Sequence, residues 1–138
     1  MKRLTYLEAV RFHGHTGPFL ALGYKAGEYA MEKLKPQKML NIKCSVKTIE
    51  KKPYTCIIDG IQCSTHCTVG KGNIKIEGTS DERVEITFRC KGRKVMLTLK
   101  PHILKRVLEA EDLEKEVKRL NEEPLESLFE IEEGSRRL

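Results

Sequence analysis

Three of the four histidines and three of the five cysteines lie in two short segments of the chain. Imidazole and thiolate groups bind zinc and other borderline-soft metals, and glycines beside them let a metal or a substrate approach the backbone. We therefore expect the chemistry of this chain in these segments. They run from Phe12 to Pro18, with His13 and His15, and from Cys56 to Asn73, with Cys56, Cys63, His66 and Cys67.

His13 and His15 are two residues apart, a spacing that lets both imidazoles face one ion on a loop. On a regular helix the same two side chains would point apart. Gly14, Gly17 and Pro18 favour the loop. Histidines also cap helices and form hydrogen bonds in cores, so a structural role for the pair stays open.

The cysteines of the second segment have different expected roles. Cys63 and Cys67 share one face if residues 59–67 form a helix, and Cys63 is expected to pack there as a small hydrophobe. Cys67 lies where that helix should end, among polar residues and before two glycines. Such surroundings suit a metal ligand or a nucleophile. Cys56 precedes the helix and can face either the site or the core.

A glycine-rich stretch follows Cys67 in the sequence. Gly70, Lys71 and Gly72 could form a backbone concavity that binds an anion, with Lys71 adding positive charge. The same residues are typical of a tight turn into the next strand, so that alternative stays open. The stretch is not a Walker loop, because the spacing differs and no Lys-Ser or Lys-Thr pair follows.

Apolar periodicity predicts the elements that position the two segments. Residues 4–12 should form a helix, and a second helix should begin at Pro18 and end before Pro36. The second helix carries small residues that would allow close packing, namely Gly23, Gly27 and Ala30. The later elements are a strand over 41–49, a short strand over 54–58 leading into a helix from Asp59, an antiparallel meander of strands over 73–77, 83–90 and 94–100, and helices after Pro101 and Pro124.

Charge divides the chain into two parts. Residues 1–108 hold 21 Lys and Arg against 9 Asp and Glu, whereas residues 109–138 hold 5 against 11. We interpret the first part as a core domain that carries the site. The second part is expected to be an acidic helical extension packed on the core or on a partner subunit.

Composition also bears on where the protein works. No apolar run reaches the roughly 18 residues of a membrane span, and the first residues lack the pattern of a signal peptide. We therefore expect a cytoplasmic protein whose cysteines are thiols or metal ligands rather than disulfides. Few Asn and Gln beside 33% charged residues hint at a thermophilic source.

The two segments together resemble the formylmethanofuran dehydrogenase E-subunit family. The matching residues are Phe12-His13-Gly14-His15 with Gly17-Pro18, Leu22-Gly23-x-x-Ala26-Gly27, and Asp59-Gly60-Ile61-Gln62 followed by Thr65-x-Cys67-Thr68-x-Gly70-Lys71-Gly72-Asn73. The resemblance covers residues 5–100. It implies an α+β fold with a mixed β-sheet flanked by helices in a thioredoxin-like arrangement, with C-terminal helices beyond it.

The resemblance also implies an active site where the His13 segment meets Cys67, occupied by zinc in some members. Some relatives carry a C-terminal zinc finger, whose cysteines this chain lacks. His66 stands where the family has a glycine, so it would narrow the pocket, add a ligand or turn outward. Members occur beside a molybdenum or tungsten formylmethanofuran dehydrogenase, which is the expected protein partner, and a homodimer is expected from the family and from an apolar seam at Leu125, Leu128 and Phe129.

Three hypotheses follow for the function. The first is a metal-binding accessory protein or small enzyme of one-carbon or redox metabolism, with zinc as the expected metal. Its ligands would be His13, His15 and Cys67, with one position open to water or substrate. Asp59 would orient a ligand histidine or cap the site helix. The other site residues would be Thr65 and Thr68 as hydrogen-bond partners of the thiolate, and Gly70, Lys71 and Gly72 as the binding place of an anionic small molecule.

The second hypothesis is a metal-free site in which Cys67 acts as a redox thiol or nucleophile. The third is a basic module that binds a protein or a nucleic acid. Only eight aromatic residues are present and no ribonucleoprotein motif occurs, so nucleic acid is the least expected partner.

Overall fold

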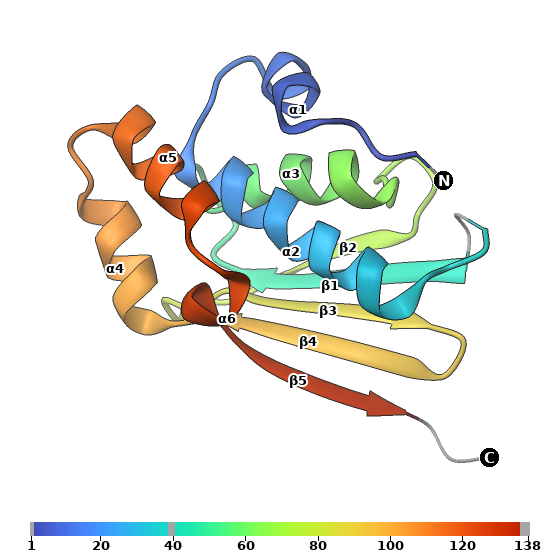
Figure 1. The fold of residues 1–138 in the computed structure, drawn as a ribbon. Coiled ribbons are helices and arrows are strands. Elements are labelled where there is room, and N and C mark those ends of the chain that lie inside the picture. The colour runs from blue at the N-terminus through green and yellow to red at the C-terminus, as the bar shows by residue number, and fades with distance from the viewer. Residues whose placement is uncertain (1, 39–40, 136–138) are drawn as a thin grey trace.

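A single five-stranded sheet with helices packed on one of its faces organises the chain (Figure 1). The computed structural model describes residues 2–38 and 41–135. No helix in these residues is long and apolar enough to cross a lipid bilayer. The elements in chain order are α1 (Tyr6–His13), α2 (Pro18–Leu34), β1 (Ile42–Thr48), α3 (Cys56–Thr65), β2 (Ile74–Gly78), β3 (Glu85–Cys90), β4 (Arg93–Leu99), α4 (Pro101–Glu109), α5 (Leu113–Glu122), α6 (Leu125–Leu128) and β5 (Phe129–Ser135).

The sheet has the strand order β2-β1-β3-β4-β5 and is mixed. Strands β1 and β2 pair in parallel, and the other neighbours pair antiparallel. This confirms the predicted α+β class with a mixed sheet. The predicted meander is wrong for its first strand, because β2 pairs with β1 and not with β3. Parallel strands need a crossover connection, and α3 supplies it between β1 and β2.

The predicted strand over 54–58 is also wrong. Residues 51–55 form a turn, and α3 begins at Cys56, three residues before the expected start. A short apolar run cannot be assigned to helix or strand by periodicity alone. Here Ile57, Ile58 and Ile61 lie at helical spacing, and their burial against α2 and the sheet favours the helix.

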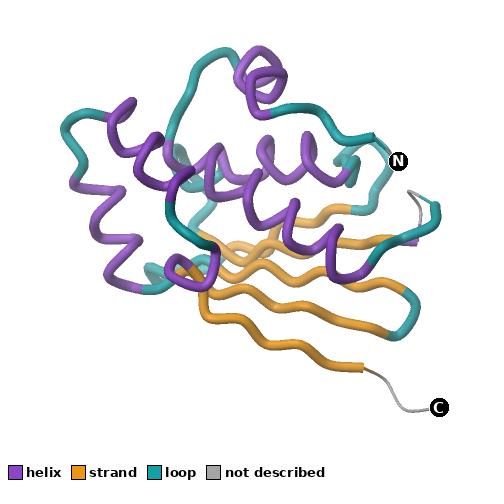
Figure 2. The backbone as a smooth tube through the Cα atoms, in the orientation of Figure 1, coloured by secondary structure: helices purple, strands orange, loops and turns teal. Residues whose placement is uncertain are grey.

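The acidic C-terminal extension is not helical throughout. After α4, α5 and α6 the chain forms β5, which pairs with β4 from Phe129 to Ser135 and completes the sheet (Figure 2). Leu125, Leu128 and Phe129 are buried in the main hydrophobic core. The apolar seam predicted from these residues therefore packs on the chain's own domain. The glutamates of β5 lie along an outer strand, where charge discourages pairing with another chain.

Helices α2 and α3 pack at a distance that only glycine permits. A Cβ atom at Gly23 would overlap the Ile57 carbonyl, and one at Gly27 would overlap the Ser64 side chain. A Cβ at Gly60 of α3 would meet the Leu20 carbonyl in the same way. The predicted close packing at Gly23 and Gly27 is thus confirmed. It fixes α3 against the first turns of α2, and so places the two predicted site segments relative to each other.

Candidate functional site

The end of α1 and the start of α2 position the two histidines. Thr5 and Glu8 form a capping box that begins α1, and Gly14 ends it with a φ of 103°. That left-handed conformation suits glycine. His13 is therefore the last residue of a helix rather than part of a loop. His15 follows in the turn before Pro18. Because only His13 belongs to the helix, the two side chains do not have to point apart as they would within one helix.

His13 meets Asp59 across the gap between α1 and α3. His13 Nδ1 lies 2.6 Å from Asp59 Oδ2, and a carboxylate accepts, so the ring donates from Nδ1. The other carboxylate oxygen, Oδ1, accepts from Gln62 Nε2 at 3.3 Å. The His13 side chain is only 10% exposed. Its Nε2 is buried and has no hydrogen-bond partner among the described residues.

His15 lies beside His13 in a matching state. The ring centroids are 4.6 Å apart, with the ring planes tilted by 57°. His15 Nδ1 donates to the Thr16 carbonyl over 2.9 Å. Each Nδ1 is therefore bonded to an oxygen, and in the neutral ring each Nε2 carries a lone pair. Two imidazoles with this tautomer can act as metal ligands or as acceptors for a substrate proton.

A cavity of 260 Å³ opens beside the two rings. The first turn of α2 lines it, together with Pro53 and Cys56. Cys56 lines this cavity and also packs against the main core, so it meets both of the alternatives left open for it. An apolar side of the cavity comes from α4, α5 and the turn between them. Its residues there are Val107, Leu108, Ala110 and Leu113.

An ion cluster holds α4 against α5 and so fixes the apolar side of the cavity. Arg106 Nε lies 3.0 Å from Glu116 Oε1, and the same guanidinium reaches Glu123. Glu116 is 6% exposed. A buried ion pair tolerates the loss of one partner poorly, so the cluster fixes the geometry of the two helices.

Cys67 lies two residues beyond the C-terminal end of α3, apart from the histidines. Cys56 and Asp59 are in the first turn of that helix, and ten helical residues span about 15 Å. Cys67 is fully buried in the main core, with its Sγ 3.9 Å from the Ile42 carbonyl. Among the described residues, no three His, Cys, Asp or Glu side chains form a group that could hold a metal. The predicted set of His13, His15 and Cys67 is therefore not gathered.

The surroundings of Cys67 are also unlike those of a reactive thiol. Burial raises the pKa of the Cys67 thiol, against smaller lowering effects of the Thr65 hydrogen bond and the Lys71 charge. Thr65 Oγ1 donates to the Ile61 carbonyl at 2.7 Å and accepts from the Cys67 amide at 3.0 Å. A reactive thiolate needs a lowered pKa. The geometry therefore argues against the metal-free nucleophile.

The glycine-rich stretch is an exposed turn with internal hydrogen bonds. Thr68 Oγ1 accepts from the Lys71 amide at 3.2 Å, and the Gly72 amide donates to the Val69 carbonyl at 3.0 Å. Gly72 has a φ of 74°, which a glycine adopts without strain. The bonds of Lys71 and Gly72 take up backbone donors that an anion would use. Gly70 and the other two residues keep their proposed anion role only as a prediction.

His66 turns outward. It ends α3 in a left-handed conformation, with φ of 64°, and its Nε2 donates to the Lys2 carbonyl at 2.7 Å. Of the three roles considered for this residue, the structure supports the last. His66 holds the N-terminal segment against α3.

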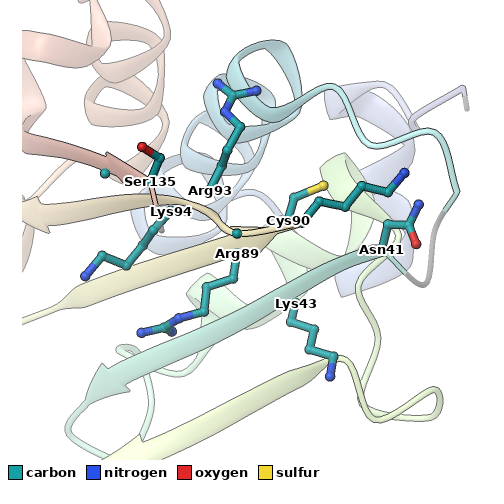
Figure 3. A pocket seen from close by; sticks show the side chains of 10 residues that line it. Asn41, Lys43, Arg89, Cys90, Arg93, Lys94 and Ser135 are labelled. Carbon is teal, nitrogen blue, oxygen red and sulfur yellow. The ribbon is translucent and has the colours of Figure 1, made fainter. Parts of the chain in front are cut away.

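A second pocket, of 550 Å³, lies near the β3–β4 turn, at the other end of the sheet from α4 and α5 (Figures 1 and 3). Lys43, Arg89 and Lys94 are neighbours in the strand register there. Figure 3 shows Arg89 and Lys94 pointing to one side and Arg93 to the other. Like charges on adjacent strands repel, so an anion would be stabilising. The basic-module hypothesis has its best location here, far from the histidines.

Sequence reasoning named His13, His15 and Asp59, which the structure brings together, but it missed the apolar side of the cavity. Leu108 and Leu113 are 39% and 48% exposed. Both flank the short break between α4 and α5, and large apolar side chains at a helix break were a usable signal. The sequence did not show that Cys56 lines the cavity, because its helix was predicted to begin at Asp59, after Cys56.

Comparison with known proteins gives three findings. A family model described as "FmdE, Molybdenum formylmethanofuran dehydrogenase operon" matches residues 12–135. A probable S-adenosyl-L-methionine-binding protein of Archaeoglobus fulgidus is 37% identical over 70 residues, which are 49% of this chain and 19% of that protein. The chain thus spans about a fifth of the length of that relative.

The third finding concerns the fold. The crystal structure of a tungsten formylmethanofuran dehydrogenase FmdE-like protein from Syntrophus aciditrophicus superimposes with a TM-score of 0.55 and 18% sequence identity. The match covers 99% of this chain and 78% of the other. At this identity the match supports the architecture of the whole described chain, while the function has to be argued from the site.

Proposed function

Because the chain belongs to the FmdE family, we propose that it is a metal-binding accessory protein or small enzyme of one-carbon or redox metabolism. The proposed metal is zinc or another divalent transition metal. Its ligands are Nε2 of His13 and Nε2 of His15, and the remaining positions are left to water or substrate. Asp59 acts through His13 as a positioning residue.

One observation carries this proposal. A histidine that binds a metal almost always donates its other ring N–H to a carboxylate or a carbonyl. His13 donates to Asp59 in this way, and its Nε2 is left buried and unpartnered in the described structure. An unpaired buried polar atom costs about 1–3 kcal/mol. A ligand at Nε2 would remove that cost.

The residues present fit a two-histidine site rather than the predicted site of two histidines and one cysteine. A bound zinc ion would polarise a substrate carbonyl or lower the pKa of a bound water. The chain's own contribution is defined by its contacts. Asp59 keeps His13 in the tautomer with a free Nε2, the Thr16 carbonyl does the same for His15, and the apolar side of the cavity limits access of water.

The proposal also includes a protein partner, a cellular compartment and an oligomeric state. The FmdE description links the family to the formylmethanofuran dehydrogenase operon, so a molybdenum or tungsten enzyme of that type is the proposed partner. All five cysteines are free, which suits the reducing cytoplasm. A homodimer stays a prediction, and its contacts would have to lie outside the buried seam of Leu125, Leu128 and Phe129.

Zinc titration by calorimetry tests the proposal. Chelator-treated protein should bind about one zinc per chain, and His13→Gln or His15→Gln should weaken binding at least tenfold. Cys67→Ser is the matched control and should bind like the parent, because Cys67 lies in the core. Zinc binding that survives both histidine changes, or that is lost in Cys67→Ser with folding intact, would overturn the ligand assignment.

A further inference from the structure

Strand β2 is an outer strand of the sheet, with β1 on one side and no strand on the other among the described residues. We propose that this open edge is the homodimer interface, where β2 pairs antiparallel with β2 of a second copy of the chain. The two sheets then form one continuous sheet across a two-fold axis. This inference rests on the homodimer of the proposed function, names its surface, and is independent of the metal site.

The backbone of β2 directs alternate residues to the open edge. At the start of the strand the Asn73 carbonyl accepts from the Cys44 amide at 2.9 Å. Just beyond its end the Thr79 amide donates to the Thr48 carbonyl at 3.2 Å. Backbone polar groups alternate between the two sides of a strand, so the odd-numbered positions from 73 to 79 face β1. The residues that present N–H and C=O groups to the open edge are Ile74, Ile76 and Gly78.

An antiparallel pair about a two-fold axis beside Ile76 uses all of these groups. Each Ile76 amide donates to the carbonyl of Ile76 of the partner subunit. On either side of the axis, Ile74 and the partner's Gly78 exchange hydrogen bonds in the same way. The whole length of β2, from Ile74 to Gly78, is then paired on both of its edges.

Charge selects this register from its neighbours. Lys75 and Glu77 flank Ile76, so the axis places each Lys75 opposite Glu77 of the partner subunit. An axis at Lys75 would set two lysines opposite each other, and an axis at Glu77 would set two glutamates opposite each other. Opposite charges stabilise a strand pair and like charges destabilise it. Both side chains are exposed, and neither takes part in an ion pair of the described residues.

The apolar side chain and the flanking turns agree with the same pairing. Ile76 is 41% exposed, whereas Ile74 is buried. Residues directly opposite in an antiparallel pair share one face, so Ile76 would pack beside the partner's Ile76. Lys71 precedes the strand and Glu82 follows it, and both are exposed. Antiparallel pairing brings the basic end of one strand to the acidic end of the other.

The other outer strand is protected against pairing by its charge. Strand β5 carries Glu130, Glu132 and Glu133 and has no lysine or arginine from Phe129 to Ser135. Two copies of β5 would bring these glutamates together, and such charge blocks edge-to-edge association. Strand β2 holds one lysine and one glutamate and has no proline. Of the two outer strands, β2 is therefore the one that can pair with its own copy.

The test follows the monomer–dimer equilibrium of the chelator-treated full chain by analytical ultracentrifugation. Lys75→Glu alone and Glu77→Lys alone should each weaken dimerisation about tenfold or more, because each sets like charges opposite one another. An equimolar mixture of the two variants should restore dimerisation, since the acidic edge of one chain meets the basic edge of the other. Parent protein that stays monomeric at about 1 mM, or a mixture no more associated than its components, would overturn the proposal.

A backbone variant tests the register independently of charge. Ile76→Pro removes an N–H that faces the open edge, so the bonds to β1 stay while both central bonds of the dimer are lost. Dimerisation should weaken about tenfold or more, with an unchanged melting curve. Glu130→Lys is the matched control, because it makes the same change of charge as Glu77→Lys on β5 and should leave the dimer unchanged. Dimerisation that survives Ile76→Pro in folded protein, or that responds to Glu130→Lys, would assign the contact to another surface.

The two proposals fail separately, because zinc titration can be made on the same proteins. A dimer through β2 that binds no zinc would remove the metal function and leave the interface. Zinc binding to both histidines by a chain that stays monomeric would do the reverse.

Discussion

His13 and Asp59 are 46 positions apart in the chain, and His13 Nδ1 lies 2.6 Å from Asp59 Oδ2. The contact joins the last residue of α1 to the first turn of α3. It fixes the tautomer of the ring and leaves Nε2 as the atom available to a ligand. The site is therefore built from the meeting of two helix ends, and the glycines between α2 and α3 make that meeting possible.

The first prediction concerns this contact. Asp59→Asn should lower zinc affinity by about 10–100-fold, because the amide no longer accepts the Nδ1 proton as a charged carboxylate does. Calorimetric titration measures the change. Gln62→Met removes the other hydrogen bond of Asp59 and should change affinity less than threefold. An Asp59→Asn variant with parental affinity would show that the carboxylate has no part in the site.

The second prediction concerns the packing of α2 on α3. Gly23→Ala should lower the free energy of unfolding by about 1–3 kcal/mol, because the new methyl group meets the Ile57 backbone carbonyl. Gly134→Ala is the matched control, since nothing lies within 4 Å of its added methyl group. Urea denaturation of the three proteins makes the comparison. Equal stabilities would mean that the helices are not in close contact.

The third prediction concerns thiol reactivity. At neutral pH, iodoacetamide should modify Cys56 before Cys67, because Cys56 is half-buried and lines the cavity whereas Cys67 is fully buried. Burial raises the pKa of both thiols, so access to the reagent sets the expected order of modification. Peptide mass mapping over time gives the order of modification. Rapid modification of Cys67 in native protein would restore the nucleophile hypothesis.

The fourth prediction concerns alkaline pH. Burial raises the pKa of Cys63 from 9.0 to about 11, so the folded state holds this proton more tightly than the unfolded state does. The contribution of this proton to the free energy of unfolding is complete below pH 9 and is lost as the pH rises towards 11. Between pH 8 and pH 10.5, Cys63→Ala should therefore lose less stability than the parent. Equal losses in urea denaturation would assign the alkaline sensitivity to other groups.

Much of the fold could be predicted from local patterns, and the exceptions depend on distant partners. The helix from Pro18 was expected because proline, small residues and apolar spacing agree, and it runs from Pro18 to Leu34. Strand β2 was expected as a strand, but its parallel pairing with β1 is set by the α3 crossover. Strand β5, rich in glutamate, becomes a strand because β4 offers it an open edge.

The candidate site, like the fold, could be predicted from the sequence only in part. Residues close in sequence to a motif need not be close to one another in space. Asp59 and Cys67 belong to one motif, yet α3 separates them and directs Asp59 to His13 and Cys67 to the core. Which end of α3 reaches the histidines depends on how that helix runs relative to α1. Local sequence patterns do not give this orientation.

The central claim is that the ligand-binding atoms of this protein are Nε2 of His13 and His15. The most direct measurement is an anomalous difference map at the zinc edge from a crystal soaked in zinc. The account predicts a peak within about 2.0–2.1 Å of both Nε2 atoms, with Nδ1 of His13 still bonded to Asp59. A peak on the Cys67 sulfur, or soaked crystals without a peak at the histidines, would contradict it.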